Sequence, residues 1–215
     1  MIEITADQLR REPTQKRARE RVQRILDAAD QLLAEHGSEA LGTKPVAAAA
    51  GISIGSLYFW FPDKESIAEA LALRYWHELS DLVAGVAEAA ETGELDDPVG
   101  EVLEVLAAGF RARPGFLALW FGGLRTEGMR DATRPYRTEV ARSVERIMDA
   151  RSPHLDPNLR HTVAQMVVLL GDGILREAFR LNRTGEATVL AEGGHVLRAY
   201  IDQRLKEPYE EAIIG

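Results

Sequence analysis

The sequence predicts an all-α protein, and three observations lead to that fold class. Apolar residues recur at three- and four-residue spacing along most of the chain, as they do on one face of a helix. Strand-like alternation of useful length is missing. Sequences rich in turn-forming residues separate the helical stretches, namely ETGELDDPVG, ARPG, GGLRTEG, RSPHLDP and LNRTGE.

The first four helices are expected in the N-terminal third of the chain. The first covers about residues 14–37, and a short second helix begins at Thr43, which we take as its N-cap, and ends near residue 51. Ser53 is expected to cap a third helix over 54–61, and Asp63 a long fourth helix reaching about residue 90. A strand over 52–61 is the alternative, since its isoleucines and aromatic residues also favour β-structure.

The remainder of the chain predicts five more helices and no internal repeat. Their separators are the turn-forming sequences named above. We expect them at about 99–111, 114–122, 127–150, 156–180 and 186–206.

Composition indicates a folded, soluble protein of the cytoplasm. Its 215 residues, 46% of them hydrophobic and 28% charged, suffice for one large core or two smaller ones. The lack of cysteine excludes disulfides and thiolate metal sites and suits a reducing compartment. Neither a signal peptide in the first 25 residues nor an 18-residue apolar run is present, so we expect no membrane association.

Charge is distributed unevenly along the chain. The net charge is -8, which argues against a protein coated in basic surface. Residues 10–24 nevertheless hold seven basic and two acidic residues, a balance of +5 (7 − 2). We therefore expect residues 1–18 to form a flexible basic arm; the part around Lys16, Arg17 and Arg19 either reaches a DNA minor groove or is a solvated tail.

The run YFWF at residues 58–61 places four aromatic residues in sequence, and a helix cannot bury all four on one side. Leu57, Trp60 and Phe61 share one face and are expected in the core. A basic approach followed by a helix-turn-helix points to DNA binding in the major groove by the second helix of the pair. The residues left for that groove are Ile54, Gly55, Ser56, Tyr58 and Phe59.

The outward residues suggest how bases are read. The hydroxyl of Ser56 can serve any base, and Ile54 and Phe59 can contact thymine methyl groups. Gly55 allows close approach. For Phe59 two roles remain possible, contact with DNA and a structural role in helix packing.

At this point the motif resembles a known family. The sequences RILDAADQLLAEHG and TKPVAAAAGISIGSLYFWFPDKESIAEAL are similar to the N-terminal domain of the TetR family of bacterial transcriptional regulators. The resemblance covers roughly residues 19–79, with the helix-turn-helix at about 42–61. It implies that residues 80–215 form a helical effector-binding and dimerisation domain. It further implies a ligand-responsive repressor that binds a palindromic operator in double-stranded DNA as a homodimer, with an unknown small-molecule effector.

The resemblance also implies roles for individual DNA-binding residues. Thr43, Tyr58 and Lys64 would hold phosphates, and Lys44 would reach bases or backbone; Thr43 and Ser53 also fit as caps alone, and Lys44 as a solvated charge. The chain departs from the family pattern at Gly42, where a threonine is common, and at Phe59, where a polar residue is common. These departures support an alternative, a small-molecule-binding or interaction protein whose DNA motif is degenerate.

In the C-terminal part, two apolar stripes and several aromatic residues are candidates for function. By resemblance to the family the stripes form the dimer interface; packing inside one chain is the alternative. The residues of the stripes are Leu170, Gly171, Ile174, Ala178, Val189, Gly193, Val196, Leu197, Tyr200 and Ile201. An effector pocket, for which an ordinary helical core is the alternative, would use Trp76, Phe110, Phe116, Trp120, Phe121, Arg125, His161, Gln165, Met166, Asp172 and Phe179.

Catalysis and cofactor binding are not expected. The five histidines are scattered and match no metal-binding spacing. The glycines of FGGLRTEG follow no strand, so they do not form a phosphate-binding loop. We therefore expect a protein that is not an enzyme and holds neither metal nor cofactor.

Overall fold

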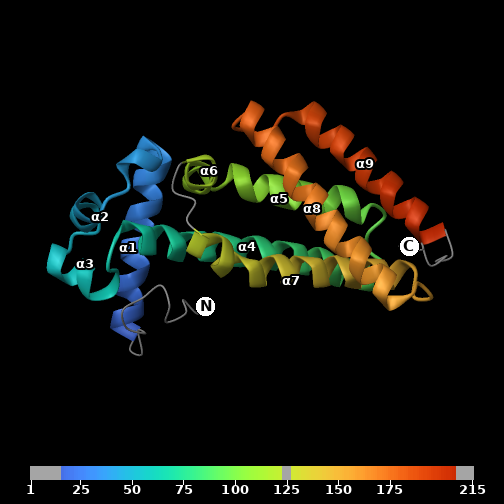
Figure 1. Ribbon diagram of the computed structural model, residues 1–215, viewed down its shortest axis with the longest axis horizontal. Coiled ribbons are helices and arrows are strands. Elements are labelled where there is room, and N and C mark those ends of the chain that lie inside the picture. Colours follow the sequence, from blue (N-terminus) through green and yellow to red (C-terminus); the bar gives the residue numbers. More distant parts are fainter. Residues whose placement is uncertain (1–15, 123–126, 207–215) are drawn as a thin grey trace, which may run out of the picture. The chain divides into compact units, whose positions relative to one another are not determined.

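The computed structural model describes residues 16–122 and 127–206, with the backbone alone for residues 127–133. All regular secondary structure in these ranges is helical, which confirms the predicted fold class and excludes the alternative of a strand over 52–61 (Figure 1). The helices are α1 (Lys16–His36), η1 (Ser38–Ala40), α2 (Thr43–Ala49), α3 (Ile54–Trp60), α4 (Lys64–Glu91), α5 (Pro98–Arg111), α6 (Pro114–Phe121), α7 (Glu127–Arg151), α8 (Pro157–Leu181) and α9 (Ala187–Lys206).

Three local predictions need correction. The short 3-10 helix η1 was missed. Gly42, in extended conformation, is the N-cap of α2, and Thr43 is the first helical residue instead of the cap. Lys16 and Arg17 belong to α1, so the part of the predicted arm that can be described is helical; residues 1–15 lie outside the described ranges.

Two other predicted caps are confirmed. Asp63 accepts a hydrogen bond from the Ser66 amide at 2.8 Å, and the Ser66 hydroxyl approaches the Asp63 amide at 3.4 Å, so the two side chains cap the start of α4 reciprocally. Ser53 caps α3 by accepting from the Ser56 amide at 3.2 Å.

The described helices group into two compact units. The first takes its residues from within Met1–Glu78 and Ala112–Arg134, and the second from within Leu79–Arg111 and Pro135–Gly215. Helix α4 contributes to both units. The predicted division into 19–79 and 80–215 did not foresee that α6 groups with the first unit.

In the first unit, α1 packs against η1, α2 and α6, and α2 packs against α3. The apolar stripe of α1 supplies the buried residues Val22, Ile25, Leu26, Ala29 and Leu33. Helix α6 approaches α1 closely at Gly115, where an added Cβ would overlap the Asp30 side chain and the Tyr75 hydroxyl. Gly115 does not have a positive φ, so its backbone conformation does not require glycine. Glycine is required there because a side chain has no room.

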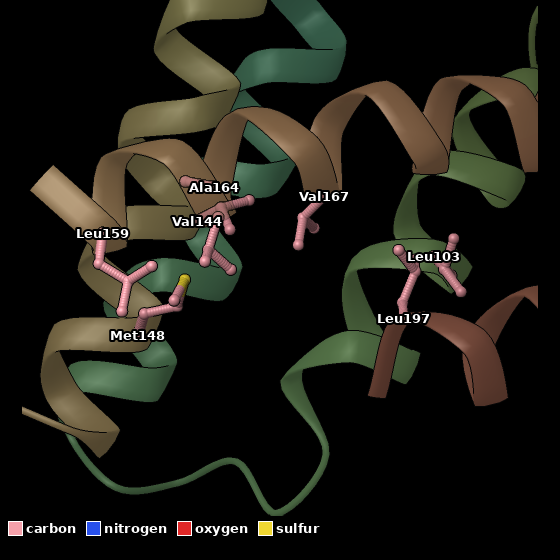
Figure 2. Packing of buried hydrophobic residues seen from close by; sticks show 8 residues of the cluster. Leu103, Val144, Met148, Leu159, Ala164, Val167 and Leu197 are labelled. Atoms are coloured by element: carbon pink, nitrogen blue, oxygen red, sulfur yellow. The ribbon is translucent and has the colours of Figure 1, made fainter. Parts of the chain in front are cut away.

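The second unit has a core built from four helices (Figure 2). Leu103 of α5 and Leu197 of α9 lie on one side of this cluster, with Val144 and Met148 of α7 and several residues of α8 on the other. Helices α8 and α9 lie side by side (Figure 1). They meet at Gly193, where a Cβ would overlap Ile174.

Charged side chains fix the loop between α4 and α5 in the second unit. Arg198 of α9 donates two hydrogen bonds to Asp97 at 3.0 and 2.6 Å, and Arg151 of α7 donates to the carbonyls of Leu95 and Asp96 at 2.5 and 2.7 Å. The hydrogen bond from Arg198 lowers the pKa of Asp97. This loop is therefore held from two helices that follow it in the sequence.

Candidate functional site

A glycine-dependent turn positions α3 relative to α2. Gly51 has a φ of 65°, a value that side chains with a Cβ rarely adopt. Its amide donates to the Ala48 carbonyl at 3.1 Å, and the Ile52 amide donates to the Ala47 carbonyl at 3.0 Å. These two bonds form a Schellman motif, which ends α2 and turns the chain toward α3.

The four consecutive aromatic residues divide between core and surface as expected. Leu57, Trp60 and Phe61 are buried. Tyr58 is 40% and Phe59 45% exposed, which are high values for aromatic side chains, and Ile54 is 38% exposed. The Phe59 ring meets Trp60 edge-on, with centroids 4.8 Å apart and planes at 83°. Both roles weighed for Phe59 thus have support, because it packs against a core residue and also faces outward.

Two of the predicted phosphate-binding residues contact each other. The hydroxyls of Thr43, at the start of α2, and Tyr58, near the end of α3, lie 3.2 Å apart and share a hydrogen bond. Sequence reasoning missed this pairing, since residues 15 apart give no periodic signal. The bond ties the outer surfaces of the two helices together at the predicted docking face.

The remaining predicted DNA-binding residues lie at the surface around this pair. Lys44 in α2 and Lys64 at the start of α4 are exposed. Gly55 has open space around the position of a Cβ, and Ser56 is half-buried. Ser53 is exposed, but its hydroxyl serves as a cap. The first unit thus presents apolar, hydroxyl and lysine side chains around one short helix.

A charged network around one buried arginine joins α1 to α4, and the sequence reasoning did not find it. Arg74, whose side chain is only 6% exposed, donates to Asp27 at 2.6 Å and to Asp30 at 3.2 Å. The Tyr75 hydroxyl donates to Asp30 as well. Burial, followed by this hydrogen bond, raises the pKa of Tyr75 far above its ordinary value. The available signal was a pair of aspartates three residues apart beside the apolar stripe of α1.

Three of the predicted pocket residues form one aromatic cluster in the first unit. The rings of Trp76 and Trp120 have centroids 5.0 Å apart, and Phe116 meets Trp120 edge-on at 4.7 Å. Phe116 and Trp120 are buried, while Trp76 is partly exposed. Phe121 at the end of α6 is exposed. Helices α4 and α6 therefore build a cluster with one accessible indole.

Comparisons with known proteins agree with this architecture. Residues 25–71 match the profile described as bacterial regulatory proteins of the tetR family, and residues 93–205 match the C-terminal domain described as tetracyclin repressor-like. The second match alone covers more than half of the chain. This protein belongs to the TetR family. It is a TetR-family transcriptional regulator.

Among curated relatives, this TetR-family chain is similar to the HTH-type transcriptional repressor LfrR of Mycolicibacterium smegmatis. The two are 40% identical over 89 residues, which is 40% of this chain and 44% of that repressor. The match thus spans less than half the length of the relative.

Solved structures share the fold over most of the chain. A TetR-family transcriptional regulator from Streptomyces coelicolor is 29% identical with a TM-score of 0.56, covering 85% of this chain and 98% of that one. The multidrug binding protein EbrR, in complex with imidazole, is 28% identical with a TM-score of 0.59, covering 89% and 97%. In complex with ethidium it is 25% identical with a TM-score of 0.59, covering 84% and 98%.

The other predicted pocket residues that the structure of this TetR-family regulator describes belong to the second unit and do not form one group. Phe110 and Phe179 are buried and pack with ring centroids 5.2 Å apart. Asp172 accepts from Arg137 at 2.7 Å and from Arg176 at 3.3 Å. Met166, His161 and Gln165 are exposed, and His161 hydrogen-bonds both Gln165 and the half-buried Glu145. Arg125 lies outside the described residues.

The predicted dimer stripes of the TetR-family chain contribute to packing within the chain. Ala178, Gly193 and Leu197 are buried within the chain, and Leu170, Ile174, Tyr200 and Ile201 pack against the core cluster of Figure 2. These residues take part in the apolar contact between α8 and α9 of the same chain, and their contact with a second copy stays a prediction. Gly171 and Val189 are half-buried.

Other apolar side chains of α8 and α9 lie at the surface. Leu169 is 58% and Val196 55% exposed, and Met166 is exposed one turn before Leu169. Of these three, only Val196 was in the predicted interface.

Metal binding and membrane insertion find no support in the part of the chain that can be described. Among the side chains that the structure describes, in residues 16–122 and 134–206, no cluster of three or more acidic or histidine residues is placed to bind a metal. Within the same ranges no helix has the length and hydropathy to cross a bilayer.

Proposed function

We propose that this regulator is a ligand-responsive repressor that binds a pseudo-palindromic operator as a homodimer in the cytoplasm. The observation that carries the proposal is the exposed outer face of α3, held by a helix-turn-helix in a TetR-family chain. The partial similarity to the repressor LfrR supports repression as the mode of action. A dimer would present two such helices to the two half-sites.

In the proposed complex, α3 enters the major groove and its flanks hold the backbone. Thr43, Tyr58 and Lys64 contact phosphates, and Lys44 reaches the backbone or a neighbouring base. The hydrogen bond between Thr43 and Tyr58 orders both hydroxyls before DNA arrives. Phosphate contacts of this kind set the register of the helix and leave sequence preference to the groove.

The test is an electrophoretic mobility shift assay with the full chain and the DNA that flanks the protein's own gene. Wild type should retain this DNA specifically, and Lys64→Ala should weaken binding to every sequence and reduce the salt slope by about one. Lys206→Ala, which removes an equal charge from the end of α9, is the matched control and should bind as wild type does. Specific binding unchanged by the double variant Tyr58→Ala, Lys64→Ala would reject the docking mode. Absence of any specific binding would favour the degenerate-motif alternative.

For the dimer we propose the exposed face of α8 and α9, with Met166, Leu169 and Val196 at its centre. Exposed apolar residues on adjoining helices are the kind of surface that a second copy covers. Leu169→Glu should shift the chain toward monomer in light scattering and leave its helix content unchanged. Leu181→Glu, at an exposed leucine near the end of α8, is the control. A Leu169→Glu chain that stays dimeric would place the interface elsewhere.

For the effector we propose an aromatic small molecule that stacks against Trp76 at the cluster of α4 and α6. The accessible indole supports this, as does the complex of the related EbrR with ethidium. Helix α4 supplies Trp76 and also supplies residues to both units, so it is the proposed carrier of the signal. Ethidium should quench tryptophan emission saturably in wild type and in Trp60→Phe. An identical titration in Trp76→Phe would count against this site.

A further inference from the structure

The outer face of α3 lacks the side chains that usually identify bases. None of the seven residues of α3 is Arg, Lys, Asn, Gln, Asp or Glu. Those side chains make the bidentate hydrogen bonds that distinguish guanine, adenine and cytosine in the major groove. If α3 enters the groove, its sequence preference must come from another kind of contact.

Hydroxyl groups provide little of that preference. The Ser53 hydroxyl already accepts a hydrogen bond from the Ser56 amide, and the Tyr58 hydroxyl shares a hydrogen bond with the Thr43 hydroxyl. Ser56 keeps a hydroxyl, but serine can pair with any base and so discriminates weakly. What remains on the exposed side of α3 is apolar surface.

Ile54 and Phe59 supply that surface on successive turns of α3. They are 38% and 45% exposed, well above what most large apolar residues show in this chain. Gly55, adjacent to Ile54, leaves open space where a Cβ would stand, so nothing holds the groove floor away from them. The edge-on contact with the buried Trp60 restrains the Phe59 ring, which lowers the entropic cost of placing it against a base.

The major groove offers one apolar group, the 5-methyl of thymine. We infer that Ile54 and Phe59 select thymine by burying its methyl group, so that each operator half-site has thymines at the positions beneath them. This inference rests on the proposed function, because it assumes that α3 binds DNA. Removing the methyl group exposes the two side chains to water again and leaves every base hydrogen bond intact.

The experiment starts from an operator that the full chain selects out of random double-stranded DNA. Each thymine of one half-site is then replaced singly by deoxyuridine, which removes only the methyl group. Wild type should lose about fourfold in affinity at a thymine whose methyl is fully buried, the equivalent of one apolar carbon at about 0.8 kcal/mol. Thymines away from α3 should show no loss.

Coupling to the protein side chains completes the test. In Phe59→Ala the deoxyuridine penalty should vanish at one thymine and persist at the others, and Ile54→Ala should remove the penalty at a different thymine. Lys64→Ala is the control, with weaker binding overall and all methyl penalties unchanged. Both substituted side chains are exposed, and matching thermal transitions verify that the variants fold.

Two results would overturn the inference. One is a wild-type affinity that is the same for the thymine and deoxyuridine operators, which can be measured without any variant. The other is a penalty that persists in both alanine variants, since the methyl would then act through DNA shape. Failure of the proposed function looks different, because the selection would then yield no preferred sequence at all.

Discussion

Helix α3 exposes apolar side chains to solvent, whereas the contact between α1 and α4 buries a charged one. At α3, Ile54 and Phe59 lie open beside buried Trp60. At the other contact, Arg74 lies almost fully buried between Asp27 and Asp30. Each arrangement is unfavourable for a side chain taken alone, and each persists because something else compensates for it.

The compensation differs between the two regions. Arg74 of α4 donates hydrogen bonds to Asp27 and Asp30 of α1, so the buried arginine holds α4 against α1. Ile54 and Phe59 of α3 stay 38% and 45% exposed, and the proposed DNA is what would cover them. The difference suggests that substitutions at the α1–α4 contact act on stability, and that those on the outer face of α3 act on recognition.

The largest expected effect separates two neighbours in the sequence. Trp60→Ala should lower the free energy of unfolding by about 3–5 kcal/mol, because it leaves a cavity beside Leu57 and Phe61. Phe59→Ala should lower it by less than about 1 kcal/mol, mainly through the lost ring contact. Denaturant titration measures both. Equal losses would show that Phe59 belongs to the core and would remove the contrast.

Arg74→Met should produce the next largest loss, about 2–3 kcal/mol in free energy of unfolding. Removing one partner of a fully buried ion pair costs about 3–5 kcal/mol, and the partly exposed aspartates can rehydrate, which reduces the loss.

Arg146→Ala is the matched control, because its pair with Glu91 is exposed on both sides and should contribute little to stability. An Arg74→Met chain as stable as the control would mean that the buried pairs do not hold α1 to α4.

Tyr75→Phe should have the smallest effect at neutral pH, about 1 kcal/mol for the lost hydrogen bond to Asp30. The folded chain holds the Tyr75 pKa above its ordinary 10.0, so the protonated phenol stabilises the fold fully below pH 10. That stability falls as the pH rises and the unfolded chain ionises first, by up to about 1.4 kcal/mol per pH unit.

The difference between wild type and Tyr75→Phe should therefore narrow between pH 10 and 11 in urea titrations. A constant gap between wild type and Tyr75→Phe would show that the buried phenol does not resist ionisation.

Sequence reasoning succeeded where the signal was local. The period of α1, the caps at Ser53 and Asp63 and the division of residues 57–61 depend on neighbours within one or two turns, so spacing revealed them. It left two interpretations open where an apolar stripe can serve either of two contacts. The apolar spacing of residues such as Leu197 and Ala178 fits contact with a second copy of the chain and contact between α8 and α9 equally well. Periodicity cannot distinguish these two kinds of contact.

The sequence by itself determined the all-α class, the helix-turn-helix and the side of α3 that faces outward, because these follow from residue type and helical period. Tertiary structure alone decided that α6 lies on α1 through Gly115, that Arg74 meets two aspartates more than forty positions away, and that Thr43 meets Tyr58. Such contacts depend on how distant segments pack in space. Neither helical period nor residue type specifies that packing.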